Sequence, residues 1–387
     1  MIYYGKQNIS EEDIKAVEVA LRSDFLTQGP VIERFERCVA DYCGVKYAVA
    51  VTNATSALHI ACLAADMGKG DVLWTSPITF VASANCARYC GADVDFVDID
   101  PKTYNMSVDH LEEKLHKAKK EGKLPKMLIP VHLAGQSCDM KGIHALAKEY
   151  GFTVTEDASH ALGADYLDTK VGSCAFSDMT VFSFHPVKII TTGEGGMVLT
   201  NRKDLYEKLL LYRSHGITRN AVDMTHEPDG SWYYQQIELG FNYRMTDIQA
   251  ALGCSQMDRL DVFVARRREL AARYDFLLQD LSVQTPYVME GTNPSWHIYI
   301  AQLDFSEIGK TKMQVFQEMK ECGIVLNLHY IPVHEQPYYE ELGFCTGDFP
   351  HSERYYSKAF TLPLYYGFTE EQQDRVVDSL RDIISAC

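Results

Sequence analysis

The sequence predicts an α/β fold, with a large and mainly parallel sheet covered by helices on both faces and a smaller α+β domain after it. Three observations predict this class. Short apolar runs alternate with helical stretches over the first half of the chain, as in sheets built from strand–helix–strand crossovers. The runs are largely apolar and are bounded by turn residues, which is typical of strands buried on both faces. From about Thr246 to Asp280 the pattern becomes long and helical.

The expected elements follow this alternation in order. Strands are expected at residues 47–51, 71–76, 94–100, 127–133, 153–157, 179–184 and 195–200. Helices are expected from Thr55 onward and over 81–90, and the smaller domain is expected to hold 297–305, a helix over 310–323, and 324–330. A chain of 387 residues is long enough for one large and one small domain. The large domain is expected over 1–250, and a connecting helix with the small domain over 251–387.

Composition narrows the class of protein. The chain is 46% hydrophobic and 23% charged, the balance of a globular protein with a large core. A formal net charge of −16 argues against binding to nucleic acid or anionic membranes. No signal peptide and no membrane span are expected. The eleven cysteines are scattered without a C-x-x-C pair, so we expect a reducing cytoplasm and no metal, with Cys86 and Cys90 packed in the core.

The strongest chemical signal is VFSFHPVKIITTGEGGMV at 181–198. A strand is expected to end at Ser183 or Phe184, and Lys188 follows it at the carboxyl edge of the sheet, where α/β proteins bind ligands. A lysine that acts as a covalent amine needs a shielded pocket that lowers its pKa. The alternative for Lys188 is a solvated surface lysine. The GEGG segment lacks the G-x-G-x-x-G spacing, which argues against a dinucleotide-binding oxidoreductase.

A second signal is TVTEDASHALGA at 153–164, where an apolar strand ends in Glu156 and Asp157. A buried carboxylate there needs a cationic partner, and the protonated pyridine nitrogen of pyridoxal 5'-phosphate (PLP) is such a partner. Alternatively, Asp157 caps a helix or a turn. His160 either packs on the cofactor or satisfies a turn.

Two further segments complete a pattern. In VTNATSALHI, 51–60, a strand runs into a helix N-terminus at Ala54 and Thr55, which can bind an anion or can be an ordinary capped helix. In TSPITFVASAN, 75–85, Phe80 follows a strand and is either a ring-stacking aromatic or a core side chain. A phosphate cradle, an aromatic, a carboxylate and a lysine in this order are together what PLP requires.

With these motifs in place, the sequence resembles the DegT/DnrJ-type sugar aminotransferases, a branch of the fold-type I PLP enzymes. The resemblance covers nearly the whole chain, from DFLTQGPVIERFE at 24–36 to LHYIPVHEQPYY at 328–339. Its most specific motifs are SFHPVKIITTGEGG and GFNYRMTDIQAALG. It implies a fold-type I PLP-dependent transferase.

The resemblance also implies a role for each matching residue. Lys188 matches the Schiff-base lysine, Asp157 the acid that pairs with the pyridine nitrogen, and Phe80 the ring-stacking aromatic. His160 matches a position beside the PLP hydroxyl where relatives commonly carry Gln, so its contact departs from the pattern. The matched phosphate-cradle positions are Ala54, Thr55 and Ser183. Asn242 matches a residue that reaches the phosphate of a neighbouring subunit's cofactor, which implies a homodimer with shared active sites.

Some relatives carry His in place of the lysine and act as dehydratases, so Lys188 favours transamination. Segments at the N-terminus, at LTQGP and at LHYIPVHEQPYY look most like aminotransferases of pseudaminic acid biosynthesis. These take L-glutamate and a UDP-linked 4-keto-6-deoxy-N-acetylhexosamine. Candidate substrate-binding residues are His215, Arg219, Arg244 and His329, each with the alternative of a structural or surface charge. The competing functions are an aminotransferase or dehydratase for another nucleotide-linked keto sugar, and a non-catalytic PLP-binding regulatory protein.

Overall fold

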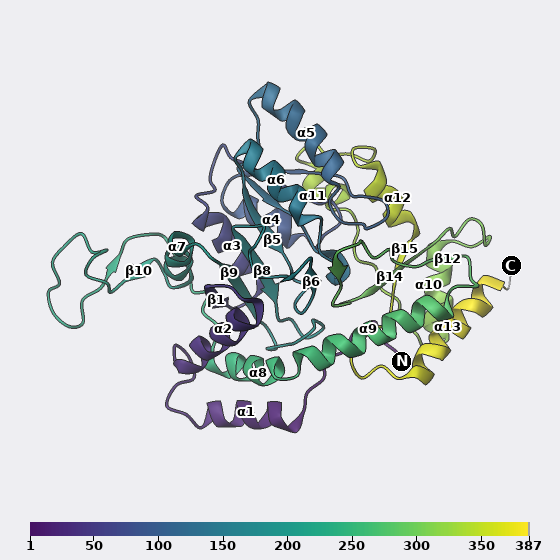
Figure 1. The fold of residues 1–387 in the computed structure, drawn as a ribbon, viewed down its shortest axis with the longest axis horizontal. Coiled ribbons are helices and arrows are strands. Elements are labelled where there is room, and N and C mark those ends of the chain that lie inside the picture. The colour runs from purple at the N-terminus through teal and green to yellow at the C-terminus, as the bar shows by residue number, and fades with distance from the viewer. Residues whose placement is uncertain (386–387) are drawn as a thin grey trace.

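The computed structural model describes residues 1–385 and is built around one seven-stranded sheet (Figure 1). Its strands are, across the sheet, β1 (Tyr47–Val51), β9 (Gly196–Thr200), β8 (Met179–Ser183), β5 (Thr153–Asp157), β4 (Met127–Ile129), β2 (Val72–Thr75) and β3 (Asp93–Phe96). Strand β9 is antiparallel to both of its neighbours, and the other pairs are parallel. The predicted mainly parallel sheet is therefore confirmed.

Helices cover both faces of this sheet. One face packs on α3 (Ala54–Ala64), α4 (Ala82–Tyr89) and α7 (Lys203–Arg213). The other packs on α2 (Pro30–Cys43), α5 (Val108–Glu121), α6 (Met140–Tyr150), α8 (Asp247–Met257) and the start of α9 (Leu260–Leu277). Helix α1 (Glu11–Leu21) packs on α8.

Strand β1 shows why the runs do not alternate between apolar and polar residues. Val49 and Val51 join the core cluster of α3, whereas Ala48 and Ala50 join that of α2. Successive side chains of a strand point to opposite faces, so a strand covered on both sides is apolar on both faces rather than on alternate positions. The alternation of runs and helices in the sequence thus follows directly from this layering.

The C-terminal part contains a three-stranded sheet of β12 (Val283–Gln284), β14 (Tyr299–Leu303) and β15 (Ala359–Leu362). It packs with α9, α10 (Lys312–Glu321) and α13 (Glu370–Ser385). The other elements of the second half are η2 (Val333–Glu335), α11 (Pro337–Glu340), α12 (Pro350–Lys358) and β13 (Thr292–Asn293), which pairs with the small hairpin β6 (Asp165–Tyr166) and β7 (Thr169–Lys170).

Two details differ from the expected elements. The long helical stretch after Thr246 is two helices, α8 and α9, and at the break Arg259 forms an ion pair with buried Asp13 of α1. Residues 324–330 form isolated bridges rather than a strand, one of them between Ile324 and Ile2. The first residues of the chain therefore pack against its C-terminal part.

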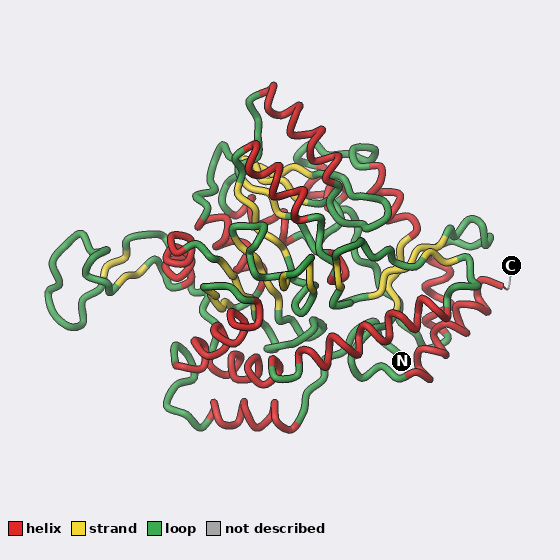
Figure 2. Tube along the Cα trace, viewed as in Figure 1, coloured by secondary structure: helices red, strands yellow, loops and turns green. Residues whose placement is uncertain are grey.

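One segment leaves the body as an arm. It carries the short hairpin of β10 (Ile217–Thr218) and β11 (Gln235–Gln236) and projects beyond α7 (Figures 1 and 2). At its base Gly216 has a φ of 68°, and a Cβ there would lie 1.8 Å from the Glu238 carbonyl oxygen. A glycine is required for this close approach. Apolar side chains on the arm are exposed, including Val222 at 88% and Leu239 at 77%.

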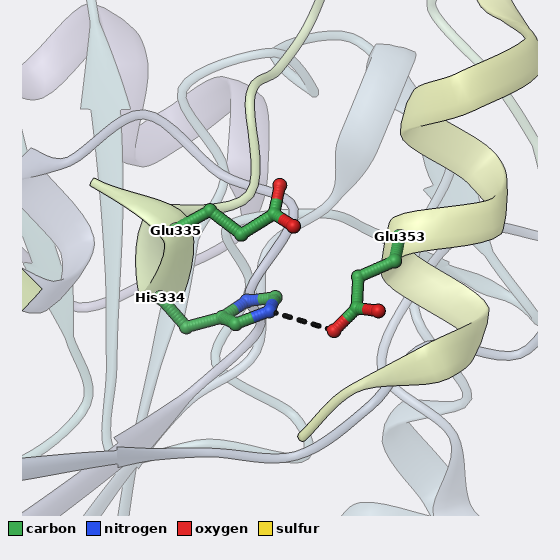
Figure 3. Close-up of side chains that lie close together, drawn as sticks. All are labelled: His334, Glu335 and Glu353. Carbon is green, nitrogen blue, oxygen red and sulfur yellow. Dashed lines mark hydrogen bonds and ion pairs between the residues drawn. The ribbon is translucent and has the colours of Figure 1, made fainter. Parts of the chain in front are cut away.

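The loop before α12 is fixed by a buried histidine (Figure 3). His334 Nε2 lies 3.1 Å from Glu353 Oε1, which also accepts a hydrogen bond from the Gly347 backbone N–H. Glu335 lies beside this pair. Of residues 1–385, the cysteines are all unpaired, and no helix in this part of the chain has the length and apolarity to span a bilayer.

Candidate active site

A cavity of about 500 Å³ opens at the carboxyl ends of β1, β5 and β8, where ligands bind in α/β sheets. The predicted site residues that line it are Ala54, Thr55, Phe80, Asp157, His160, Ser183, Lys188 and His329. They come from segments spread over most of the chain. The fold therefore brings the separate sequence motifs together in one place.

Lys188 lies in the turn that follows β8, where its backbone N–H donates to the His185 carbonyl. Burial in the cavity wall lowers the pKa of its amine to about 8, and the negative charge of Asp157 opposes this shift in part. The ordinary lysine value is 10.5, so roughly 300 times more of the amine is neutral at pH 7. A neutral amine can act as a nucleophile or a base.

Asp157 is held at the end of β5 by two donors. Ser83 Oγ donates to Oδ2 at 2.6 Å, and the Ser159 backbone N–H donates to Oδ1 at 3.1 Å. Thr79 in turn lies 2.8 Å from Ser83, so the carboxylate has a fixed direction. Asp157 caps no helix, but its bond from the Ser159 N–H caps the turn after β5, so the turn-capping role that the sequence allowed is present beside its place in the cavity. Sequence reasoning missed Ser83 and Thr79, although both lie in the quoted segment 75–85.

The N-terminus of α3 forms an anion cradle. The Asn53 side chain caps the Ser56 N–H, which leaves the backbone N–H groups of Ala54 and Thr55 facing the cavity. Ser183 enters the same cavity from the end of β8. A Cβ at Gly196 would lie 2.4 Å from the Asn53 carbonyl carbon, so this glycine lets α3 approach the sheet. Free N–H groups and hydroxyls here fit a phosphate.

Three neutral imidazoles form one wall of the cavity. Burial, together with the charge of Lys188, lowers the pKa of His160 and His297 well below the ordinary value and that of His329 to about 3. His160 lines the cavity, and its two ring nitrogens hydrogen-bond to Ala134 and Tyr330, which are distant in the sequence, rather than to its own turn. Tyr330 lies beside it, and Phe80, which is more than half exposed and so not a core side chain, approaches Tyr330 with ring centroids 6.2 Å apart.

Sequence reasoning missed several residues of the lining. His297 precedes β14, and Tyr4 comes from the N-terminal segment. Neither has a local pattern that marks it. Tyr330 lies in the LHYIPVHEQPYY segment, which could have pointed to it.

Four of the predicted site residues do not line the cavity of this chain. Asn242, His215 and Arg219 lie on the arm or at its base, where Ser214 bridges to Asn242 and Arg219 lies over the Tyr234 ring at 5.8 Å. The close approach of Gly216 to the 238–240 segment directs the arm away from the body. Substrate binding by His215 and Arg219 therefore stays a prediction, and Arg244, whose backbone forms a bridge with Val51, also lies outside the lining.

Fold and cavity together define a fold-type I PLP-dependent enzyme. The described residues supply an amine of lowered pKa, a fixed carboxylate and a cradle of free donors. These groups match the aldehyde, ring nitrogen and phosphate of PLP in charge and hydrogen-bonding character. The site thus fits the cofactor that the sequence predicts.

The model of the DegT/DnrJ/EryC1/StrS aminotransferase family matches residues 7–381, and the chain belongs to this family. The spore coat polysaccharide biosynthesis protein SpsC of Bacillus subtilis is 38% identical over 98% of this chain and 96% of its own. The UDP-4-amino-4,6-dideoxy-N-acetyl-beta-L-altrosamine transaminase of Campylobacter jejuni is 36% identical over 99% and 98%. The GDP-perosamine synthase of Caulobacter vibrioides is 38% identical over 92% and 91%.

Solved structures of sugar aminotransferases are similar to this chain over its full length. Helicobacter pylori PseC, an aminotransferase of pseudaminic acid biosynthesis, superposes with a TM-score of 0.90 at 29% identity over all of both chains. The PLP form of the putative sugar aminotransferase Spr1654 of Streptococcus pneumoniae has a TM-score of 0.88 at 27% identity, covering 99% of this chain and 98% of that one. This protein is a PLP-dependent sugar aminotransferase.

Proposed function

We propose that the enzyme transfers the amino group of L-glutamate to the C4 keto group of a UDP-linked 4-keto-6-deoxy-N-acetylhexosamine, in pseudaminic acid biosynthesis. The observation that carries the chemistry is the Lys188 amine of lowered pKa beside the fixed Asp157 carboxylate. The choice of sugar is supported by full-length similarity to the Campylobacter transaminase and to PseC.

Each catalytic group has a task that its surroundings support. When bound, PLP supplies a ring that withdraws electrons from the carbon bearing the transferred amino group. Asp157 holds a proton at the ring nitrogen. Lys188, released as a neutral amine, takes the proton from the α-carbon of glutamate and later delivers one to the sugar carbon. The α3 cradle anchors the phosphate through Ala54, Thr55 and Ser183.

We also propose a homodimer with shared active sites, in which the arm of one subunit reaches the cavity of its partner. Of the described residues, one lysine and no arginine line the cavity, yet a nucleotide diphosphate needs cations. Arg219 on the arm can supply a cation to a second copy, His215 can supply a hydrogen-bonding ring, and Asn242 can reach the partner's cofactor phosphate. Contact with a second copy would also bury the exposed apolar side chains of the arm.

We also propose that residues 1–250 form the large domain and residues 251–387 the small one.

Product identification tests the proposal. Purified enzyme is incubated with L-glutamate and a panel of UDP-, GDP- and dTDP-linked 4-keto sugars, and products are analysed by mass spectrometry and NMR. We expect 2-oxoglutarate and a 4-amino sugar from the UDP-linked N-acetyl substrate. Preference for another nucleotide identifies the alternative aminotransferase, and a deoxygenated product identifies a dehydratase.

A catalytic control separates an enzyme from a PLP-binding regulator. Lys188→Ala is expected to abolish turnover and the visible absorbance of the bound cofactor. Lys203→Ala, on an exposed side chain of α7, is the matched control and is expected to retain both. Turnover by pure Lys188→Ala enzyme would reject the assignment, and a bound cofactor without turnover of any substrate would favour the regulator.

A further inference from the structure

The ring of His160 is held at both nitrogens. The Ala134 backbone N–H donates to Nδ1 at 3.3 Å, so Nδ1 carries a lone pair and a neutral ring has its proton on Nε2. Burial and the charge of Lys188 keep the pKa of His160 far below its ordinary value. The Nε2–H group therefore donates to the Tyr330 hydroxyl oxygen, 3.0 Å away.

The Tyr330 hydroxyl consequently has a proton left to donate. A phenol oxygen that accepts from His160 can still donate its own hydrogen, and none of residues 1–385 is placed to accept it. Burial and the charge of Asp157 raise the pKa of Tyr330, so its hydroxyl stays protonated. The side chain lines the cavity that holds Lys188 and Asp157. A ligand in this cavity can accept the hydrogen bond.

His297 supports His160 from behind. Its ring centroid lies 4.4 Å from that of His160, and its side chain is only 3% exposed. The His297 backbone N–H donates to the Ala134 carbonyl at 3.0 Å, and the His297 carbonyl accepts from Arg267 Nη1 at 3.0 Å. One peptide segment at Ala134 thus binds both histidines.

The turn that carries Ala134 is conformationally strained. This residue of η1 (Leu133–Gly135) has a φ of 59°, a left-handed conformation disfavoured for any residue with a side chain. A Cβ at Gly135 would lie 2.8 Å from the His160 carbonyl oxygen, so the turn presses closely on the histidine. Strain of this kind persists where the surroundings over-determine it, as at active sites.

We propose that Tyr330 is a ligand-contacting residue whose hydroxyl donates a hydrogen bond to an acceptor oxygen of the cofactor or the substrate, and that His160 and His297 are positioning residues that aim it. The inference rests on the proposed function, because it takes the cavity beside Lys188 as the place of reaction. It assigns His160 an indirect role, through Tyr330.

The test compares Tyr330→Phe with Tyr338→Phe in the holoenzyme. Tyr338 is half exposed and outside the cavity. PLP affinity, the pH titration of cofactor absorbance and the kcat and KM for both substrates are measured. The titratable groups facing Tyr330 are His160, His329, Asp157, Tyr4 and Tyr355, and both variants retain them.

Losing one hydrogen bond between neutral groups is expected to lower the affected constant by about 3- to 10-fold. Weaker PLP binding with a shifted titration assigns the acceptor oxygen to the cofactor. Unchanged PLP binding with a lower kcat/KM for one substrate assigns it to that substrate. Equality of the Tyr330→Phe and Tyr338→Phe enzymes in all measurements would overturn the proposal.

Variants of His160 test the positioning role. His160→Leu is expected to reproduce the Tyr330→Phe effect, and His160→Gln, which keeps an N–H donor, is expected to restore part of it. The double variant His160→Leu/Tyr330→Phe should be no worse than either single variant. Additive losses would refute the coupling. If wild type and Tyr338→Phe are both inactive on every sugar, the proposed function has failed, not this inference.

Discussion

Replacing Lys188 by Met should stabilise the PLP-free protein at neutral pH. The folded protein lowers the pKa of this amine from 10.5 to about 8, while the unfolded chain keeps the ordinary value. At 1.36 kcal/mol per pKa unit, this shift lowers the free energy of unfolding by about 3 kcal/mol at pH 7. The loss is the same whether the buried amine stays charged or gives up its proton on folding. Water that reaches the amine through the cavity makes this loss smaller. We therefore expect the neutral Met side chain, which is of similar length, to raise the free energy of unfolding by about 1–3 kcal/mol.

The pH dependence gives this prediction its sign. Below pH 8 the full penalty is present, and it disappears as the pH rises from about 8 toward 10.5, because the folded protein loses its proton first. The gain from Lys188→Met at pH 9.5 should therefore be less than half of that at pH 7. Urea denaturation of the PLP-free proteins at both values measures it.

A matched control isolates the buried amine. Lys203→Met changes a side chain that is 74% exposed and should alter the free energy of unfolding little at either pH. If Lys188→Met is less stable than wild type at pH 7, or if its gain does not change with pH, the reasoning about this amine is refuted.

Three other changes test separate parts of the site. Asp157→Asn should retain some PLP but lose most of the turnover, because an amide cannot hold the ring proton; near-normal kcat would contradict its role. Gly196→Ala places a Cβ 2.4 Å from the Asn53 carbonyl carbon, and such overpacking should lower the free energy of unfolding by about 1–3 kcal/mol in urea denaturation. PLP titration should show weaker binding because the added Cβ displaces the α3 cradle, and unchanged stability and affinity would show that the cradle tolerates movement. Asn242→Ala and Lys188→Ala subunits should each be poorly active, and mixing them should restore activity in heterodimers that hold one intact site; no recovery after verified subunit exchange would argue against shared sites.

Much of the fold could be predicted from local sequence. Strands β1, β5 and β8 each carry apolar side chains in their buried stretch because both faces of the sheet are covered. Their carboxyl ends are marked by polar residues, so Asp157 and Lys188 could be assigned to one edge of the sheet before their contacts were known.

Other features had no local signal. His297 and Tyr4 reach the cavity from segments far from Lys188 in the chain. The break between α8 and α9 coincides with the ion pair of Arg259 with Asp13, again a distant contact.

The sequence by itself determined the alternation of strands and helices, the chemical types of the reacting groups and the edge of the sheet at which they gather, because these depend on periodicity and on strand ends. Tertiary structure decided which side chains complete the cavity wall and that His215 and Arg219 leave it on the arm. The physical reason is that a pKa, a hydrogen-bond direction or the path of a segment depends on neighbours in space. For Lys188, His160 and the arm, those neighbours come from distant parts of the chain.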